Sequence, residues 1–384
     1  MPSIFKIFKF FYAVALLIGM IVGAGTFAIP YVFSQAGFFI GLFYLLALTL
    51  AVVAVHLFYG EIILRTHQPH RLVGYAAKYF GGRVKKIASV TLLFEYYGAL
   101  LVYLILGGQF LAIIFGRWFG GSEFLWALIF FLLGAFGVFW RLNTLAKNEL
   151  WMVALLLAGV IILLIKGAPL VQLANFSSFN ISKFFLPYGV VLFALAGAAA
   201  IPEMRQILIG EEKKLKPAII WGTLIPAVLY LLFALVVVGV TGSQTTQEAI
   251  EGLVPYLGSW VIMLGAIFGF FAVYTSFLVL GTAIKKIFQQ DYRIRGTWAF
   301  ALACFVPLIA YLAGLKNFIL IIGFIGAVFS GLDGILTIFI YFKARREGDR
   351  HPEYRLRWAR ILGILLIFLF SFGIIYQFFY LSGR

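Results

Sequence analysis

Two apolar stretches of this chain, far apart in the sequence, are each interrupted by a run of small residues that leads into Ile-Pro. The first interruption reads Gly-Ala-Gly-Thr-Phe-Ala-Ile-Pro over residues 23–30, and the second reads Leu-Ala-Gly-Ala-Ala-Ala-Ile-Pro-Glu over residues 195–203. Backbone that leaves the helix inside a bilayer must be buried in protein or line a cavity, because lipid offers it no hydrogen bonds. A pair of such breaks at matching places in two halves of a chain indicates a substrate site near the middle of the membrane.

The composition supports a membrane location. The chain has 384 residues, of which 64% are hydrophobic and only 11% are charged, whereas about a quarter of the residues of a soluble domain are charged. The formal net charge of +16 comes from Lys and Arg between the apolar runs. We therefore interpret it as a topology signal, with the lipid bilayer as partner and no nucleic acid. Cys304 is the single cysteine, which excludes an intrachain disulfide.

Eleven membrane spans are predicted, within a single transporter domain that covers residues 1–384. A helix needs about 20 apolar residues to cross a bilayer, and charged residues, Gly and Pro separate the apolar runs. The predicted spans cover residues 10–33, 38–64, 87–115, 124–140, 150–165, 185–209, 217–240, 257–287, 297–312, 318–342 and 359–381.

The orientation follows from Lys and Arg in the loops, which gather on the cytoplasmic side of membrane proteins. With the N-terminus inside and the C-terminus outside, 25 of the 30 lysines and arginines fall on the inner side and 5 on the outer side. This bias supports an odd number of spans. We expect an integral protein of the plasma (cytoplasmic) membrane.

The breaks fall in the first and sixth predicted spans, so that the second break comes five spans after the first. Because five is odd, the two halves have opposite topology. We therefore predict an inverted repeat of five plus five spans, covering about 10–165 and 185–342, with an extra helix at 359–381.

At these residues the chain resembles a known family. The stretch at 23–30, followed by Ser-Gln-Ala-Gly at 34–37, resembles the first helix of amino acid permeases of the amino acid–polyamine–organocation superfamily. The tryptophan/tyrosine permeases and the auxin/amino acid permeases are the most similar groups. Ala-Ile-Pro-Glu at 200–203 is similar to their sixth-helix signature. The resemblance implies an all-α polytopic protein with a leucine-transporter-like fold and secondary active transport of amino acids.

An amino acid substrate is a zwitterion, so its carboxylate needs hydrogen-bond donors and its ammonium group needs acceptors. The N-terminus of a half-helix offers unpaired N–H groups and the positive end of the helix dipole, and glycine permits close approach. We predict that N–H groups around Ala24, Gly25 and Thr26 bind the carboxylate, while carbonyls freed near 21–22 and 194–197 bind the ammonium group. The alternative for the glycines is close helix packing, which leaves the paired Ile-Pro unexplained.

The small residues of the second break leave room for a large side chain, which favours an aromatic or large neutral amino acid. Tyr103 occupies a position where a matching tyrosine recurs in the permeases that the chain resembles. The predicted substrate-binding residues are Val22, Gly23, Ala24, Gly25, Thr26, Phe27, Tyr103, Ala194, Leu195, Ala196, Gly197 and Ala200.

The coupling ion is predicted to be either sodium or a proton, and no other cofactor is predicted. Sodium prefers oxygen ligands such as the carbonyls at a helix break. In sodium-coupled members of the fold that the chain resembles, a Thr-Ser pair on the eighth helix joins carbonyls of the first helix. The matching residues are Gly19, Val22, Ala272, Thr275 and Ser276. The alternative is that Thr and Ser hydrogen-bond their own helix.

A proton needs a titratable group, and acids inside a membrane are costly unless they are functional. The candidates are Glu203, Glu95 and Asp333, each on a different span, with Glu203 favoured because it adjoins the second break. Its alternatives are stabilisation by the half-helix dipole or a gate pairing with Arg205 or a nearby lysine. The aromatic permeases that the chain resembles are proton-coupled as a group.

Two further acid–base residues have structural explanations. Glu61 lies one helical turn before Arg65 and is expected to pair with it, and a lone His56 on an apolar helix is expected to be a satisfied core residue.

Other function classes fit less well. The chain lacks His-Glu-x-x-His and Gly-x-Ser-x-Gly motifs, so a membrane enzyme is a remote alternative. An uncoupled uniporter, an exchanger or a substrate sensor on the same fold stays open, and the sequence leaves the oligomeric state undetermined.

Overall fold

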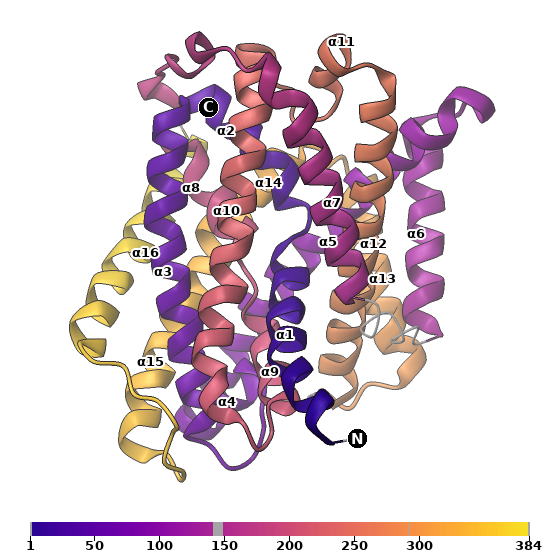
Figure 1. Ribbon diagram of the computed structural model, residues 1–384. Coiled ribbons are helices and arrows are strands. Elements are labelled where there is room, and N and C mark those ends of the chain that lie inside the picture. Colours follow the sequence, from indigo (N-terminus) through magenta and orange to yellow (C-terminus); the bar gives the residue numbers. More distant parts are fainter. Residues whose placement is uncertain (1, 141–148, 291, 383–384) are drawn as a thin grey trace.

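The computed structural model describes residues 2–140, 149–290 and 292–382, and the regular secondary structure of these residues is helical throughout. The helices run side by side in one bundle, with the two termini at opposite ends (Figure 1). The longer helices are α1 (Pro2–Ile21), α2 (Gly25–Ala36), α3 (Phe38–Leu64), α5 (Gly82–Phe119), α6 (Glu123–Phe139), α7 (Glu149–Gly167), α10 (Leu215–Thr241), α12 (Ser259–Gln290), α13 (Gly296–Leu312), α15 (Gly331–Glu347) and α16 (Ala359–Ser382). The shorter ones are α4 (Leu72–Phe80), α8 (Leu186–Ala194), α9 (Ile201–Ile207), α11 (Val254–Leu257) and α14 (Phe318–Ile325).

These helices match the predicted spans in order. Within the described residues, seven helical stretches are long and apolar enough to cross a bilayer, and the bent pair of α1 and α2 makes an eighth. Three shorter apolar helices, in α6, in α7 with the turn after it, and in α13, occupy the remaining predicted spans. The all-α polytopic architecture is therefore confirmed.

The first span is broken where the sequence predicts. α1 ends at Ile21, α2 begins at Gly25, and their axes differ by 56°. A Cβ atom on Gly25 would lie 2.5 Å from the Cβ and 2.6 Å from the Cα of Ala194. Residue 25 can therefore carry no side chain, because the end of α8 lies against it.

The sixth span is broken as well. α8 ends at Ala194, a 3₁₀ turn covers Ala198–Ala200, and α9 begins at Ile201 with Pro202 in its first turn. Proline suits this position because the N–H group that it lacks has no partner within the helix. α2 packs against α8 and α1 packs against α9, so the two breaks face each other inside the bundle.

The tenth span departs from a regular helix, which the sequence analysis does not anticipate. α14 leads into a π-helical turn over Gly326–Ser330 before α15 begins at Gly331. Such turns are rare and occur frequently at functional sites.

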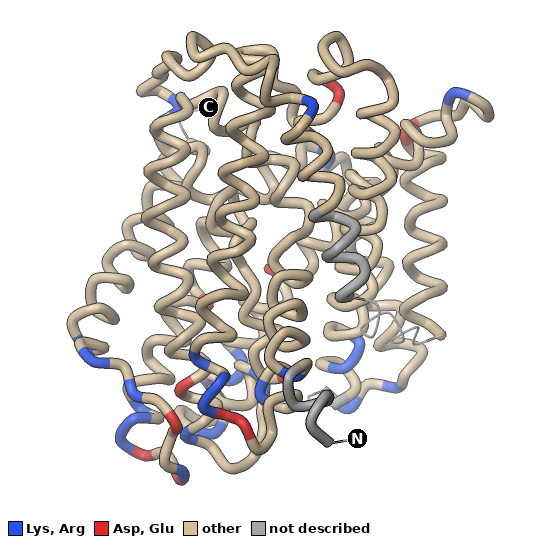
Figure 2. Tube along the Cα trace, in the orientation of Figure 1, with Lys and Arg blue, Asp and Glu red and all other residues tan. Residues whose placement is uncertain are grey.

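The basic residues gather at the end of the molecule that holds the N-terminus, and the opposite end carries few of them (Figure 2). This separation agrees with the predicted loop pattern. Arg141 and Lys147, both predicted on the inner side, lie outside the described residues.

Candidate substrate and ion site

The backbone of the first break presents free hydrogen-bond donors at the start of α2. The amide of Thr26 donates to the Gly23 carbonyl at 3.1 Å, and that of Phe27 donates to the Ala24 carbonyl at 3.2 Å. The N–H groups of Gly23, Ala24 and Gly25 find no acceptor among the described residues. They lie at the positive end of a 12-residue helix, where an anion is favoured.

The carbonyls that end α1 and α8 are joined by a residue that the sequence analysis missed. The hydroxyl of Tyr230, on α10, contacts the Ile21 carbonyl oxygen at 2.8 Å and the Ala194 carbonyl oxygen at 3.0 Å. Tyr230 is fully buried. It lies near the buried Thr26 hydroxyl, which itself makes no hydrogen bond of good geometry. The chain has 19 tyrosines, and nothing in the sequence distinguishes Tyr230 from the others.

A cavity of about 1270 Å³, including its open mouth, lies between the two breaks. It reaches Arg71, which directly precedes α4 at the basic end of the molecule. The predicted residues in its wall are Gly23, Ala24, Gly25, Tyr103, Ala194, Ala196 and Gly197. The remaining predicted residues Val22, Thr26, Phe27, Leu195 and Ala200 are buried outside this wall.

Tyr103 on α5 lies beside the first break. A Cβ atom added to Gly23 would lie 3.6 Å from the Tyr103 hydroxyl oxygen and 3.5 Å from the Ser276 Oγ atom. The break, Tyr103 and Ser276 therefore converge at one point of the cavity.

Phe27 lies on the other side of the break. Its ring centroid is 5.0 Å from that of Phe110 and 6.4 Å from that of Phe233. With Thr26 and Trp260, it lines a second and almost entirely apolar hollow of about 580 Å³. Phe27 is thus part of a packed aromatic cluster beside that hollow.

The residues predicted for sodium are only partly brought together. Ser276 is buried and approaches Gly23. The Thr275 hydroxyl instead donates to the Phe271 carbonyl at 2.9 Å and to the Ala272 carbonyl at 3.3 Å, both on its own helix. Gly19 and Val22 lie in and just after the last turn of α1. Thr275 therefore follows the alternative in which the hydroxyl bonds its own helix.

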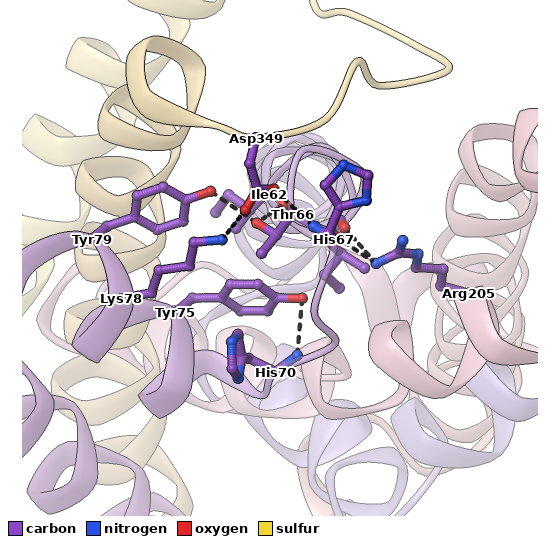
Figure 3. A network of polar contacts seen from close by, with 10 residues as sticks. Ile62, Thr66, His67, His70, Tyr75, Lys78, Tyr79, Arg205 and Asp349 are labelled. Carbon is purple, nitrogen blue, oxygen red and sulfur yellow. Dashed lines mark hydrogen bonds and ion pairs between the residues drawn. The ribbon is translucent and has the colours of Figure 1, made fainter.

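Glu203 forms an ion pair, but its partner is neither Arg205 nor a lysine. The Arg71 Nη2 and Glu203 Oε1 atoms are 2.6 Å apart, and each side chain is about 40% exposed. Arg205 instead donates to the carbonyls of Ile63 at 2.7 Å and Thr66 at 3.1 Å. Of the alternatives considered for Glu203, the pairing with Arg205 or a lysine is wrong, because Arg205 on α9 lies against the end of α3 (Figure 3).

Glu95 and Asp333, which the sequence places singly on separate helices, meet in the structure. Both line the cavity, and each accepts a hydrogen bond from a hydroxyl group on the other acid's side of the helix contact. Ser330 Oγ donates to Glu95 Oε1 at 2.6 Å, and Thr91 Oγ1 donates to Asp333 Oδ1 at 2.8 Å. The two acids thus lie on different helices, as the sequence predicts, and the fold brings them to the same part of the cavity wall.

Glu61 and His56 have the environments expected for structural residues. Glu61 pairs with Arg65 at 2.7 Å and also accepts hydrogen bonds from the Tyr341 hydroxyl and the Leu356 amide. The His56 Nδ1 atom lies 3.0 Å from the Thr223 hydroxyl, although the buried ring also forms part of the cavity wall.

Comparison with known proteins places this arrangement in a family. The model of the tryptophan/tyrosine permease family matches residues 6–378. The chain belongs to this family. It is therefore an integral membrane transporter and not an enzyme.

Relatives of the permease match it over almost its whole length. The tyrosine-specific transport system 1 of Haemophilus influenzae is 26% identical over 373 residues, which cover 92% of each chain. Glutamine transporter 2 of Aliivibrio fischeri is 22% identical over 383 residues, which cover 94% of the permease and 97% of the relative.

Two solved structures show the same fold. MhsT in complex with L-phenylalanine has a TM-score of 0.70 at 15% identity and covers 96% of the permease and 98% of MhsT. Mhp1, a nucleobase-cation-symport-1 family transporter, has a TM-score of 0.67 at 14% identity, with 97% and 92% covered. The leucine-transporter-like fold expected from the sequence is confirmed.

A polar network lies at the basic end of the permease beside Arg205 (Figure 3). Asp349, in the loop after α15, accepts hydrogen bonds from the His67 amide at 2.8 Å and from the Lys78 ammonium group at 2.5 Å. The hydrogen bond from Lys78 holds the pKa of Asp349 below its ordinary value. Thr66 and Tyr79 join their hydroxyls at 2.8 Å, so α4 is tied to the end of α3.

Proposed function

We propose that this permease imports an aromatic or large neutral amino acid by ion-coupled symport with alternating access, with its N-terminus in the cytoplasm. The observation that carries the proposal is the set of free N–H groups at Gly23, Ala24 and Gly25, at the wall of a cavity between two broken helices. The substrate carboxylate binds there, beside the Tyr103 hydroxyl. The tyrosine-specific relatives support an aromatic substrate.

The ammonium group binds on the opposite side, where α1 and α8 end. Tyr230 already contacts the Ile21 and Ala194 carbonyls, but each carbonyl oxygen has a second lone pair to offer. The side chain then extends along Ala196 and Ala99, whose small size leaves space within the cavity wall.

Access to the site is from the basic end. The cavity extends to Arg71 at that end, while Phe27 packs on Phe110 and Phe233 and lines the second hollow. By the bias of basic residues toward the cytoplasm, the arrangement corresponds to a state in which the cavity faces the cell interior.

Two observations favour a proton over sodium as the coupling ion. The Thr275 hydroxyl bonds its own helix rather than pointing to α1. In contrast, the acids Glu95 and Asp333 lie in the cavity wall together.

Purified permease in proteoliposomes tests this function. Labelled tyrosine, tryptophan and leucine are offered under a proton gradient and, separately, under a sodium gradient. We expect aromatic substrates to accumulate above equilibrium under the proton gradient. Failure of both gradients to drive accumulation would refute symport, and efficient tracer exchange in that case would identify an exchanger or a uniporter.

The amide cradle is tested by Gly25→Ala, with Gly82→Ala as the matched control. A Cβ atom at residue 25 would lie 2.5 Å from the Ala194 Cβ atom, whereas one at residue 82 meets no atom within 4 Å. We expect Gly25→Ala to lose measurable tyrosine binding while Gly82→Ala binds like the wild type. Equal affinity in all three proteins would contradict the cradle.

A further inference from the structure

The helices α5 and α15 meet at four polar side chains, arranged as two crossed pairs. Thr91 and Glu95 are one turn apart on α5, and Ser330 and Asp333 are one turn apart where α15 begins. Each hydroxyl donates to the carboxyl group of the other helix, so the crossed hydrogen bonds hold the two carboxyl groups near each other. Two carboxylates that share a site repel, and a proton on one of them removes this repulsion.

In the part of the chain that the structure describes, no cation pairs with either acid in place of that proton. Among the described residues, neither acid forms an ion pair, and no third His, Cys, Asp or Glu joins them in a possible metal site. Lys285, on the neighbouring α12, donates to the Val138 carbonyl. The other charged or titratable groups in the cavity wall are Arg71, which pairs with Glu203, and His56, Tyr59, Tyr96 and Tyr103.

The pair is accessible to water-borne protons although it lies deep in the bundle. Glu95 and Asp333 both line the cavity, and each retains some accessible surface. Two unit charges in contact repel strongly where the effective dielectric constant is low, as between helices. The pair is therefore most stable with one shared proton, and loss of that proton exerts a force between α5 and α15.

A mechanical link connects the pair to the second break. Ser330 is the last residue of the π-helical turn. A Cβ atom on Gly326, at the start of that turn, would lie 1.9 Å from the Gly189 carbonyl oxygen and 2.8 Å from the Phe193 amide nitrogen. The turn thus packs directly on the backbone of α8, whose last residue, Ala194, contacts the first break.

We propose that Glu95 and Asp333 together carry the coupling proton, shared between them while substrate is bound and released toward the basic end. This inference rests on the symport function proposed above. The pair takes up one proton from the outer side and then consists of one carboxylic acid and one carboxylate. When it releases this proton inward, two carboxylates remain, their repulsion loosens the Ser330 contact, and the π turn shifts against α8. One proton therefore crosses with one zwitterion.

The test uses the full-length permease in proteoliposomes with the membrane potential clamped at zero. At a stoichiometry of one proton, a gradient of about one pH unit drives an accumulation of about tenfold. We expect Glu95→Gln and Asp333→Asn to abolish this accumulation and yet retain tracer exchange of tyrosine at equal pH. The amide oxygens of these variants can still accept the hydrogen bonds from Ser330 and Thr91, which preserves the fold. The matched control is Glu347→Gln, an exposed acid paired with Lys343.

The possible outcomes test the shared-proton pair, proton coupling and the proposed function separately. Accumulation like that of the wild type in either carboxamide variant would overturn the shared-proton pair. If the wild type exchanges tracer but does not respond to the pH gradient, proton coupling fails while the amide cradle stands. If the wild type neither binds nor exchanges an amino acid, the proposed function itself fails.

A positioning role is tested separately with Ser330→Ala. Because Ser330 donates to Glu95, its loss is expected to shift the pH of half-maximal uptake while the affinity at saturating proton concentration is kept. An unchanged pH profile would contradict the link between the π turn and the pair.

Discussion

Replacing Tyr230 with phenylalanine removes a single oxygen atom from the place where both broken helices end. That oxygen contacts the Ile21 and Ala194 carbonyls at 2.8 and 3.0 Å. The hydroxyl has one hydrogen, which the two carbonyl acceptors share, and a buried neutral hydrogen bond contributes about 1 kcal/mol net. Its removal also leaves the two buried carbonyls without this donor, so we expect a loss of about 1 to 2 kcal/mol, or about fivefold to thirtyfold in affinity.

The assay is tyrosine binding to detergent-solubilised permease by scintillation proximity, with a thermal unfolding curve for each protein. We expect a weaker dissociation constant in Tyr230→Phe, because the ends of α1 and α8 lose the atom that positions them. Tyr256→Phe is the control, since Tyr256 is 44% exposed and distant from the breaks in sequence. A dissociation constant unchanged within twofold, or one that becomes tighter, would refute the positioning role.

Three further variants address the remaining contacts. Glu203→Gln breaks the ion pair with Arg71. Because both side chains are about 40% exposed, we expect tyrosine binding to lose less than about 1 kcal/mol of free energy. A tyrosine affinity reduced more than tenfold at physiological salt would contradict a peripheral role for this pair as a gate. Thr275→Ala is expected to leave proton-driven uptake within twofold of the wild type, and strict loss of uptake would instead favour a sodium site. Asp349→Asn removes the partner of Lys78. Because the pKa of Asp349 is lowered in the folded protein, this carboxylate stabilises the fold fully at pH values above the ordinary carboxyl pKa. The stabilisation disappears as the pH falls through the lowered pKa. Melting curves should therefore differ between variant and wild type at neutral pH and converge in acid, and a constant difference would exclude this pair as the cause.

The breaks could be predicted from the sequence because their cause is local. Glycines at 23 and 25 and the prolines at 30 and 202 stand in otherwise apolar runs, and an interrupted helix in lipid requires a partner. The spans and the basic end follow from equally local patterns of apolar and charged residues. The same reasoning explains why Tyr103 was located only through the resemblance, since its neighbours in the sequence are as apolar as those of other tyrosines.

The remaining features depend on contacts between distant segments. Tyr230 is 209 residues from Ile21, and Ser330 is 235 residues from Glu95, so neither pairing leaves a periodic signal. Glu203 pairs with Arg71, which is 132 residues away in the sequence, and not with the neighbouring Arg205, so this pairing leaves no local signal either. The π turn escapes prediction because its residues are as apolar as those of the flanking helices.

The most direct test of the account is a structure of the permease with bound L-tyrosine. The account predicts the substrate carboxylate within hydrogen-bonding distance of the N–H groups of Gly23, Ala24 or Gly25, and its ring in the cavity between the two breaks. A tyrosine bound in the apolar hollow beside Phe27, with these amides still unoccupied, would contradict it.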